Sequence, residues 1–205
     1  MSNLTFACRD ITKFRDKLNK GGARSNLFEV EIKDIPGGGA DVQDEIRFLV
    51  KAAEIPASNI GNIPVPFRGR VLPVAGDRTF DPWTVTIINN DFKIRDSMER
   101  WSNFINDMVL ANGSVDPESY QKSALVKQLS RDAASGDKPE VLRQYNFIGI
   151  YPNVISNIPL DYGATDQIEE FQVTFNYLYW TVGESNEDGK ASGLAGGRAE
   201  AGGAG

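Results

Sequence analysis

The chain has 205 residues, a formal net charge of −6, one cysteine and no histidine, with 40% hydrophobic and 24% charged residues. These values are typical of one globular domain with a hydrophobic core. A single cysteine excludes an internal disulfide, and we interpret Cys8 as a small apolar filler. The missing histidines remove the commonest general base and transition-metal ligand, and the sequence predicts neither a membrane span nor a secretory signal.

Charge is unevenly distributed along the chain. Residues 1–28 carry a net charge of +4, residues 29–183 carry −8, and residues 184–205 carry −2. Ordinary nucleic-acid binding needs lysine and arginine side chains to displace counterions from phosphates, so an acidic body argues against it. The charge does not exclude a surface past which DNA slides without sticking.

The amino-terminal third predicts a short helix and one half-buried strand. Asp10 is a candidate N-cap for a helix over 11–19, whose apolar face holds Ile11, Phe14 and Leu18 and which Gly21-Gly22 ends. Apolar and charged residues then alternate over 28–33, as in a strand with one face buried. Gly37-Gly38-Gly39 is interpreted as a flexible loop. It is no phosphate-binding fingerprint, because the required spacing and a following helix are not evident.

The next stretch predicts extended structure interrupted by a charged turn. We expect a strand over 46–53 and, because of its prolines, a poorly paired connector over 55–66. Glycine and the Asp-Pro pair indicate a turn over 76–83, which joins two apolar runs. The second run, Val85 to Ile88, is β-branched and typical of a strand.

One stretch carries a strong helical pattern. Between residues 92 and 110, apolar residues recur at spacings of four, three, four and three, which predicts an amphipathic helix. Asp91 is a candidate N-cap and Asn112-Gly113 a candidate end. The stripe consists of Ile94, Met98, Trp101, Ile105 and Met108, and we interpret Trp101 as a core residue.

The remainder predicts further extended structure and a tail. Residues 124–131 and 141–151 flank a turn-rich link over 133–137, and propensity alone leaves the first of them open to a helix. Residues 170–177 alternate strictly between apolar and polar and predict a two-faced strand. Residues 183–205 contain eight of the 20 glycines and no aromatic residue, so we expect a disordered tail.

No group of residues predicts a catalytic or metal site. Acidic pairs at Asp77 with Asp81, Asp161 with Asp166, and Glu169 with Glu170 are the candidate catalytic carboxylates. Adjacent residues of a strand point to opposite faces, which disfavours the last pair, and turn chemistry or solvated strand edges explain the others. We therefore expect no enzymatic activity and no cofactor.

Four segments resemble the tail tube proteins of contractile-tailed bacteriophages of the T-even type. The most specific is VAGDRTFDPWTV, residues 74–85. ARSNLFEVEI at 23–32 resembles the entry into the family's first strand, and KSALVKQ at 122–128 with RDA at 131–133 resembles the part after its helix. Residues 168–180 are similar to the closing strand, so the resemblance spans about 23–180 in the same order.

The resemblance implies a mainly β fold, an antiparallel β-sandwich that is partly barrel-like, with one flanking amphipathic helix. Residues 124–131 are then a strand of a hairpin. The domains are an amino-terminal arm over 1–22, the tube domain over 23–182 and the tail over 183–205. The implied function is a structural subunit of the tail tube, in which six copies form a ring and stacked rings form the conduit for genome ejection.

The implied partners are further copies of the chain, the tail sheath, baseplate and tail-terminator proteins, and viral DNA that passes without sequence-specific binding. No membrane is involved; assembly takes place in the host cytoplasm and the mature location is the virion tail. Candidate residues fall into two sets. Contacts between subunits are assigned to Arg70, Asp77, Arg78 and Asp81. The lining of the lumen is assigned to Glu29, Glu31, Glu170, Gln172, Thr174 and Asn176.

The sequence leaves two alternative functions open. The first is a tube subunit of a phage-derived injection device or of a type VI secretion system, which the neighbouring genes would distinguish. The second is a soluble β-sandwich binding module, for example one that binds glycans, which should be monomeric and show an exposed aromatic patch. For Asp77, Arg78 and Asp81, an internal turn brace is as consistent with the sequence as a contact between subunits.

Overall fold

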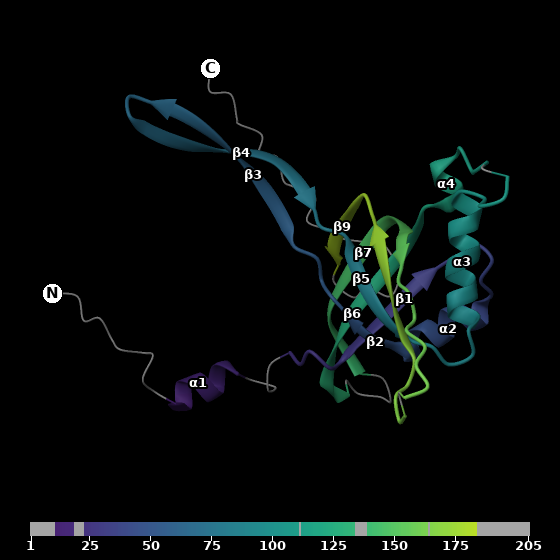
Figure 1. Cartoon of the computed structure of the whole chain (residues 1–205). Coiled ribbons are helices and arrows are strands. Elements are labelled where there is room, and N and C mark those ends of the chain that lie inside the picture. The colour runs from purple at the N-terminus through teal and green to yellow at the C-terminus, as the bar shows by residue number, and fades with distance from the viewer. Residues whose placement is uncertain (1–10, 19–22, 111, 134–138, 164, 184–205) are drawn as a thin grey trace, which may run out of the picture.

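The computed structural model describes residues 11–18, 23–110, 112–133, 139–163 and 165–183 (Figure 1). Cys8, the Asp10 cap, the Gly21-Gly22 stop and the tail after Gly183 lie outside the described residues. The described elements are α1 (Ile11–Lys17), β1 (Phe28–Lys33), α2 (Ala40–Leu49), β2 (Val50–Ala53), β3 (Ser58–Phe67), β4 (Arg70–Phe80), β5 (Trp83–Ile88), α3 (Lys93–Ile105), α4 (Pro117–Tyr120), β6 (Lys122–Ala133), β7 (Pro139–Ile155), β8 (Glu170–Asn176) and β9 (Tyr179–Gly183).

The body is a strongly bent antiparallel sheet whose halves share the long strand β7. The strand order is β1-β6-β7-β8-β5-β2, and β9 also pairs with β7. The first half contains β1, β6, the start of β7 and β9, whereas the second contains the end of β7, β8, β5 and β2. The mainly β, antiparallel, sandwich-like fold is thus confirmed, and β1 and β2 leave the barrel unclosed.

Strict alternation places one face of each half in a common core. Trp83 stacks on Phe147 at 4.5 Å between ring centroids and is tilted against Phe175 at 5.4 Å. A fully buried aromatic side chain contributes a large apolar area, so these rings join the two halves. The inward residues of the strands are Val30, Ile32, Trp83, Val85, Ile87, Ala124, Val126, Tyr145, Phe147, Ile150, Phe171, Val173 and Phe175.

Two helices, rather than the single one expected, pack against the sheet. α3 supplies Ile94, Met98 and Trp101 to the core, which confirms Trp101 as a packing residue. α2 buries Val42 and Ile46 against β1. Since none of the described helices is long and apolar enough to cross a membrane, no span is assigned to this part of the chain.

The expected strand over 46–53 is wrong in its first half. Residues 40–49 form α2, and only 50–53 form β2. Val42 and Ile46 are four residues apart and lie on one helical face, a periodicity too short to stand out in the sequence. A helix does follow the triple glycine, contrary to expectation, since α2 begins directly after Gly39.

The predicted helix at 92–110 is real but shorter. α3 begins at Lys93, and its N-cap is Phe92 in a left-handed conformation (φ 64°) rather than Asp91. It ends at Ile105, so Gly113 does not stop it but forms an isolated β-bridge with Asn106. Met108 lies beyond the helix and is exposed, not part of the core stripe.

The late strands are confirmed with one change. Residues 124–131 and 141–151 fall within β6 and β7, which pair as a hairpin. The closing stretch is two strands, because β8 ends at Asn176 and β9 pairs with the other half of the sheet. Gly183, placed at the start of the expected tail, is the last residue of β9.

Candidate assembly surfaces

A two-stranded hairpin, β3–β4, projects far from the body (Figure 1). Its strands pair from Ser58↔Phe80 to Phe67↔Arg70 with one irregularity, between Ile60 and Asn62. The expected poorly paired connector over 55–66 is therefore wrong, as is the turn over 76–83, because β4 runs through to Phe80. Prolines are tolerated because both strands of an isolated ribbon are edges, so an N–H can be absent from the outward side.

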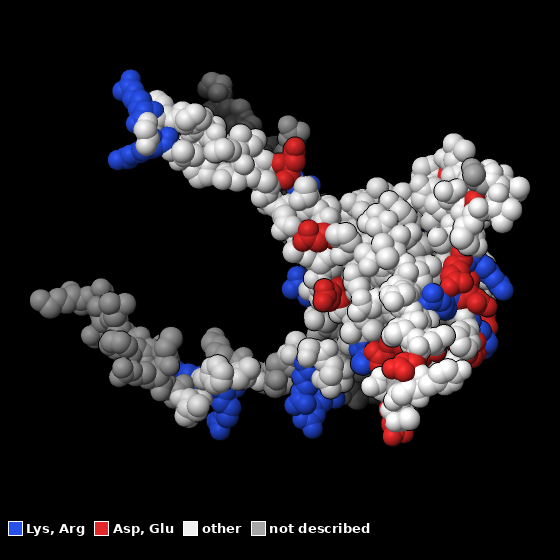
Figure 2. Space-filling model, in the orientation of Figure 1, with Lys and Arg blue, Asp and Glu red and all other residues white. Residues whose placement is uncertain are grey.

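The turn of this hairpin is at Arg68-Gly69. Both residues have positive φ, 45° and 82°, as a two-residue type I′ turn requires. The turn places Arg68 and Arg70 at the tip, which Figure 2 shows as a basic end to the arm. Glycine provides the left-handed conformation at the second position without steric cost.

One face of the hairpin carries five large uncovered apolar side chains beside Arg70, whereas Val71 and three prolines lie on the other face. Residues that pair across an antiparallel ladder share a face, and so do residues two apart along a strand. The five apolar side chains on this face are 42–66% exposed. They are Ile63, Val65, Phe67, Leu72 and Val74. Sequence reasoning missed this surface; the available signal was the alternation of residues 63, 65 and 67 directly before Arg68-Gly69.

The predicted subunit-contact residues are spread along β4 and its end. Arg70 is at the tip, Asp77 and Arg78 are exposed near the base, and Asp81 follows the strand. No ion pair joins Arg78 to Asp77 or Asp81 in the described part of the chain. An internal turn brace made by ion pairs among these three charges is therefore not seen among the described residues.

Asp81 instead holds the root of the hairpin. Asn59 Nδ2 donates to its Oδ2 at 3.1 Å, and Tyr177 Oη donates to its backbone oxygen at 2.8 Å. Burial, with a smaller contribution from the Asp81 charge, raises the pKa of Tyr177 to about 12. The phenol therefore keeps its proton, and its hydrogen bond to Asp81, to a higher pH than an ordinary tyrosine does.

Four predicted lumen residues share the outer, polar face of β8. Thr174 lies opposite Thr84, with 3.3 Å between the hydroxyl oxygens, and Asn176 Nδ2 donates to Tyr151 Oη. Gln172 is exposed opposite Thr86. The Glu170 carboxylate accepts from Lys51 Nζ at 2.6 Å, so this face carries little net charge.

Glu29 and Glu31 lie elsewhere, on the outer face of β1. Arg47 of α2 pairs with both, at 3.2 and 3.1 Å, and Lys127 pairs with Glu31 at 3.1 Å. Burial raises the pKa of Glu31, but hydrogen bonds from Lys127 and Arg47 outweigh burial, and the pKa lies below its ordinary value. These two carboxylates thus tie α2 to β1 and are not brought together with the β8 face.

The pattern of the phage tail tube protein family matches residues 23–183. Tail tube protein gp19 of Enterobacteria phage T4 is 34% identical over 164 residues, which are 77% of this chain and 90% of that protein. This chain belongs to the phage tail tube protein family. The tail tube protein of Serratia phage KSP90 is 27% identical over 174 residues, 82% of this chain and 94% of that protein.

Solved structures agree on the fold of this tail tube protein. The tube-terminating cap of the anti-feeding prophage has a TM-score of 0.57 at 17% identity, covering 80% of this chain and 92% of that one. The sheath/tube terminator of an extracellular contractile injection system, PVC, has a TM-score of 0.56 at 15% identity, covering 80% and 97%. Family membership makes the chain a structural tube subunit of a contractile tail, located in the virion tail.

Proposed function

We propose that six copies of this tail tube protein form a ring and that stacked rings form the channel for genome ejection. The observation that carries the proposal is the β3–β4 hairpin, an arm with five exposed apolar side chains on one face. An apolar face of this kind, on a strand pair with two free edges, is a liability in a monomer and a contact surface in an assembly. The arm reaches well beyond its own body (Figure 1).

Contacts along the arm divide into an apolar face and charged ends. The apolar face packs on a neighbouring subunit, whereas Arg70 at the tip and Asp77 and Arg78 near the base set the register between copies. Asp81 acts within its own subunit, because it holds the hairpin root through Asn59 and Tyr177. Exposed ion pairs contribute only about 0–1 kcal/mol each, so the apolar face provides most of the binding free energy.

We assign the channel wall to the outer face of β8 and β5. Threonine, glutamine and asparagine dominate this face, and its carboxylate Glu170 is neutralised by Lys51. A wall without excess positive charge does not release counterions from DNA, so viral DNA passes without tight contacts. Glu29 and Glu31 are assigned to bracing α2 instead.

The protein acts as a structural subunit without catalysis or cofactor, and its partners are tail sheath, baseplate and tail-terminator proteins. Light scattering and negative-stain microscopy over a wide concentration range test the proposal. We expect six-membered rings or tubes without nucleic acid. A strictly monomeric protein, even with baseplate or sheath present, would contradict it. Capsid and terminase genes beside its gene are expected for a phage and not for an injection device.

A further inference from the structure

The loop between β7 and β8 forms an open hollow, lined by both apolar and acidic side chains, that the tube proposal leaves unused. Residues 158–162 and 166–170 line a shallow hollow of about 980 Å³ that is open to solvent. Leu160 is 87% exposed, Ile168 is 72% exposed and Tyr162 is fully exposed. Large side chains that face solvent around one hollow are typical of a surface that another molecule covers.

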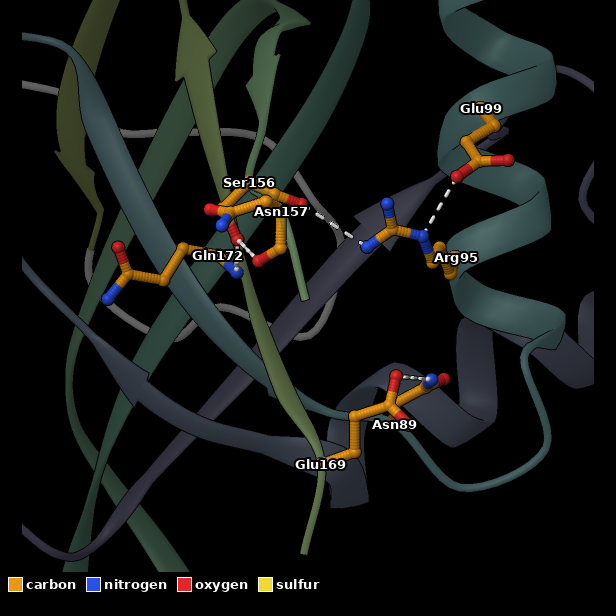
Figure 3. A network of polar contacts seen from close by, with 7 residues as sticks. All are labelled: Asn89, Arg95, Glu99, Ser156, Asn157, Glu169 and Gln172. Carbon is orange, nitrogen blue, oxygen red and sulfur yellow. Dashed lines mark hydrogen bonds and ion pairs between the residues drawn. The ribbon is translucent and has the colours of Figure 1, made fainter. Parts of the chain in front are cut away.

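Both ends of this loop are fixed to the body (Figure 3). Ser156 and Gln172 exchange hydrogen bonds at 2.8 and 2.9 Å, and Arg95 Nη1 donates to the Ser156 carbonyl at 3.3 Å. At the other end, Asn89 Nδ2 donates to the Glu169 carboxylate at 3.0 Å. A hollow with both ends fixed loses little conformational freedom when it binds.

The free charges around the hollow are acidic. Asp161 and Asp166 are exposed and make no ion pair within the described residues, whereas Glu169 and Glu170 are engaged by Asn89 and Lys51. Figure 2 shows acidic side chains at the lower end of the body, where Figure 1 places this loop. The matching ligand is therefore apolar and basic.

The chain itself carries such a ligand in α1. Ile11, Phe14 and Leu18 recur at helical spacing and are 76%, 61% and 43% exposed. Lys13 and Arg15 are exposed beside them, and residues 1–28 carry a net charge of +4. A helix of seven residues is marginal in water without packing, so α1 needs a surface to cover its apolar face.

We propose that α1 of one copy docks into the β7–β8 loop of a neighbouring copy, with its apolar face in the hollow and its basic side chains against Asp161 and Asp166. The inference rests on the proposed tube assembly and adds a second contact to the hairpin. An arm and its socket on one chain make a head-to-tail contact, which generates rings or filaments when it forms between copies. Within one copy α1 lies apart from this loop (Figure 1).

Engineered cysteines distinguish docking between copies from docking within one. In a Cys8→Ser background, Phe14→Cys and Leu160→Cys are combined in one full-length chain, which is assembled and mildly oxidised. We expect a ladder of cross-linked oligomers on a non-reducing gel. The control pairs Phe14→Cys with Val115→Cys, which replaces a 96% exposed apolar residue outside the loop. Cross-linking at least fivefold above this control supports the inference.

Other outcomes overturn it. An internally cross-linked monomer would show that the contact lies within one copy. Cross-linking no stronger than the control, in a protein that still forms tubes by microscopy, would refute the docking and leave the tube proposal intact. If the Cys8→Ser parent forms neither rings nor tubes, the docking proposal and the tube proposal both fail. As a second measurement, Asp161→Lys with Asp166→Lys should weaken assembly at least tenfold, and adding Lys13→Glu and Arg15→Glu should restore much of it.

Discussion

Replacing Val65 and Val74 with threonine tests the apolar face of the hairpin with minimal change of shape. Both valines are on this face, and threonine keeps the β-branched side chain that suits a strand. Val71 lies on the opposite face of the same ribbon, one residue from the partner of Val65. Val71→Thr is therefore a matched control with the same chemistry in the same strand pair.

The expected size of the effect follows from the exposed fractions. Val65 is 42% and Val74 is 43% exposed in the isolated subunit. Full burial of a valine stabilises by about 2 kcal/mol, so covering the exposed remainder contributes about 0.8 kcal/mol per side chain. Threonine keeps one methyl group, so each substitution loses about half of this contribution, about 0.4 kcal/mol. Burying the new hydroxyl group costs about 1 kcal/mol more. The two substitutions therefore remove about 3 kcal/mol per subunit added, which corresponds to a rise in the critical concentration for assembly of about 100-fold.

Sedimentation of tubes over a concentration series measures the critical concentration, and thermal unfolding of the unassembled protein checks the fold. We expect the double variant to assemble at least tenfold less readily at an unchanged melting temperature. Val71→Thr should change assembly by less than threefold. An equal effect of both variants, or no effect of either, would refute packing of this face on a neighbour.

Three further predictions concern single residues. Arg78→Glu should block tube growth in microscopy and leave the monomer folded; a sharp fall in melting temperature, or unchanged tubes, would rule out its subunit contact. Glu31→Gln should lower the unfolding free energy by about 1–2 kcal/mol at pH 7, because it loses charged hydrogen bonds to Lys127 and Arg47. Since the folded pKa lies below 4.5, that difference should shrink as denaturant titrations move below about pH 4. Gln172→Lys should leave tubes intact but slow DNA ejection at low salt, and normal ejection would show that wall charge does not govern passage.

The strands that alternate strictly could be predicted from the sequence because their signal is local. Residues 28–33 and 170–176 place apolar and polar side chains on opposite faces wherever the strands end up in the fold. Local sequence does not determine whether residues 124–131 form a strand or a helix. They form a strand because they pair with β1 and β7, and only the family resemblance indicated this pairing.

The prolines of the hairpin obscured its local signal, the alternation before Arg68-Gly69, because proline is unfavourable for a strand inside a sheet. Pro64, Pro66 and Pro73 argue against a central strand, yet a two-stranded ribbon has no central strand. Likewise, the sequence shows Glu29 and Glu31 as free acidic side chains. Their partner Arg47 is 16 residues or more away and reaches them only because α2 packs on β1.

Exposed apolar side chains distinguish an assembly subunit from a monomer with the same core. Trp83, Phe147 and Phe175 are completely buried, so the subunit has a full hydrophobic core without the exposed side chains. The described chain nevertheless leaves large apolar side chains in water on the β3–β4 hairpin, on α1 and in the β7–β8 loop. Isolated exposed apolar residues are ordinary, but groups of them on elements that project from or border the body are not. A tube in which every copy is surrounded by others can cover several such groups, whereas a monomeric binding module would leave most of them exposed when its ligand is bound.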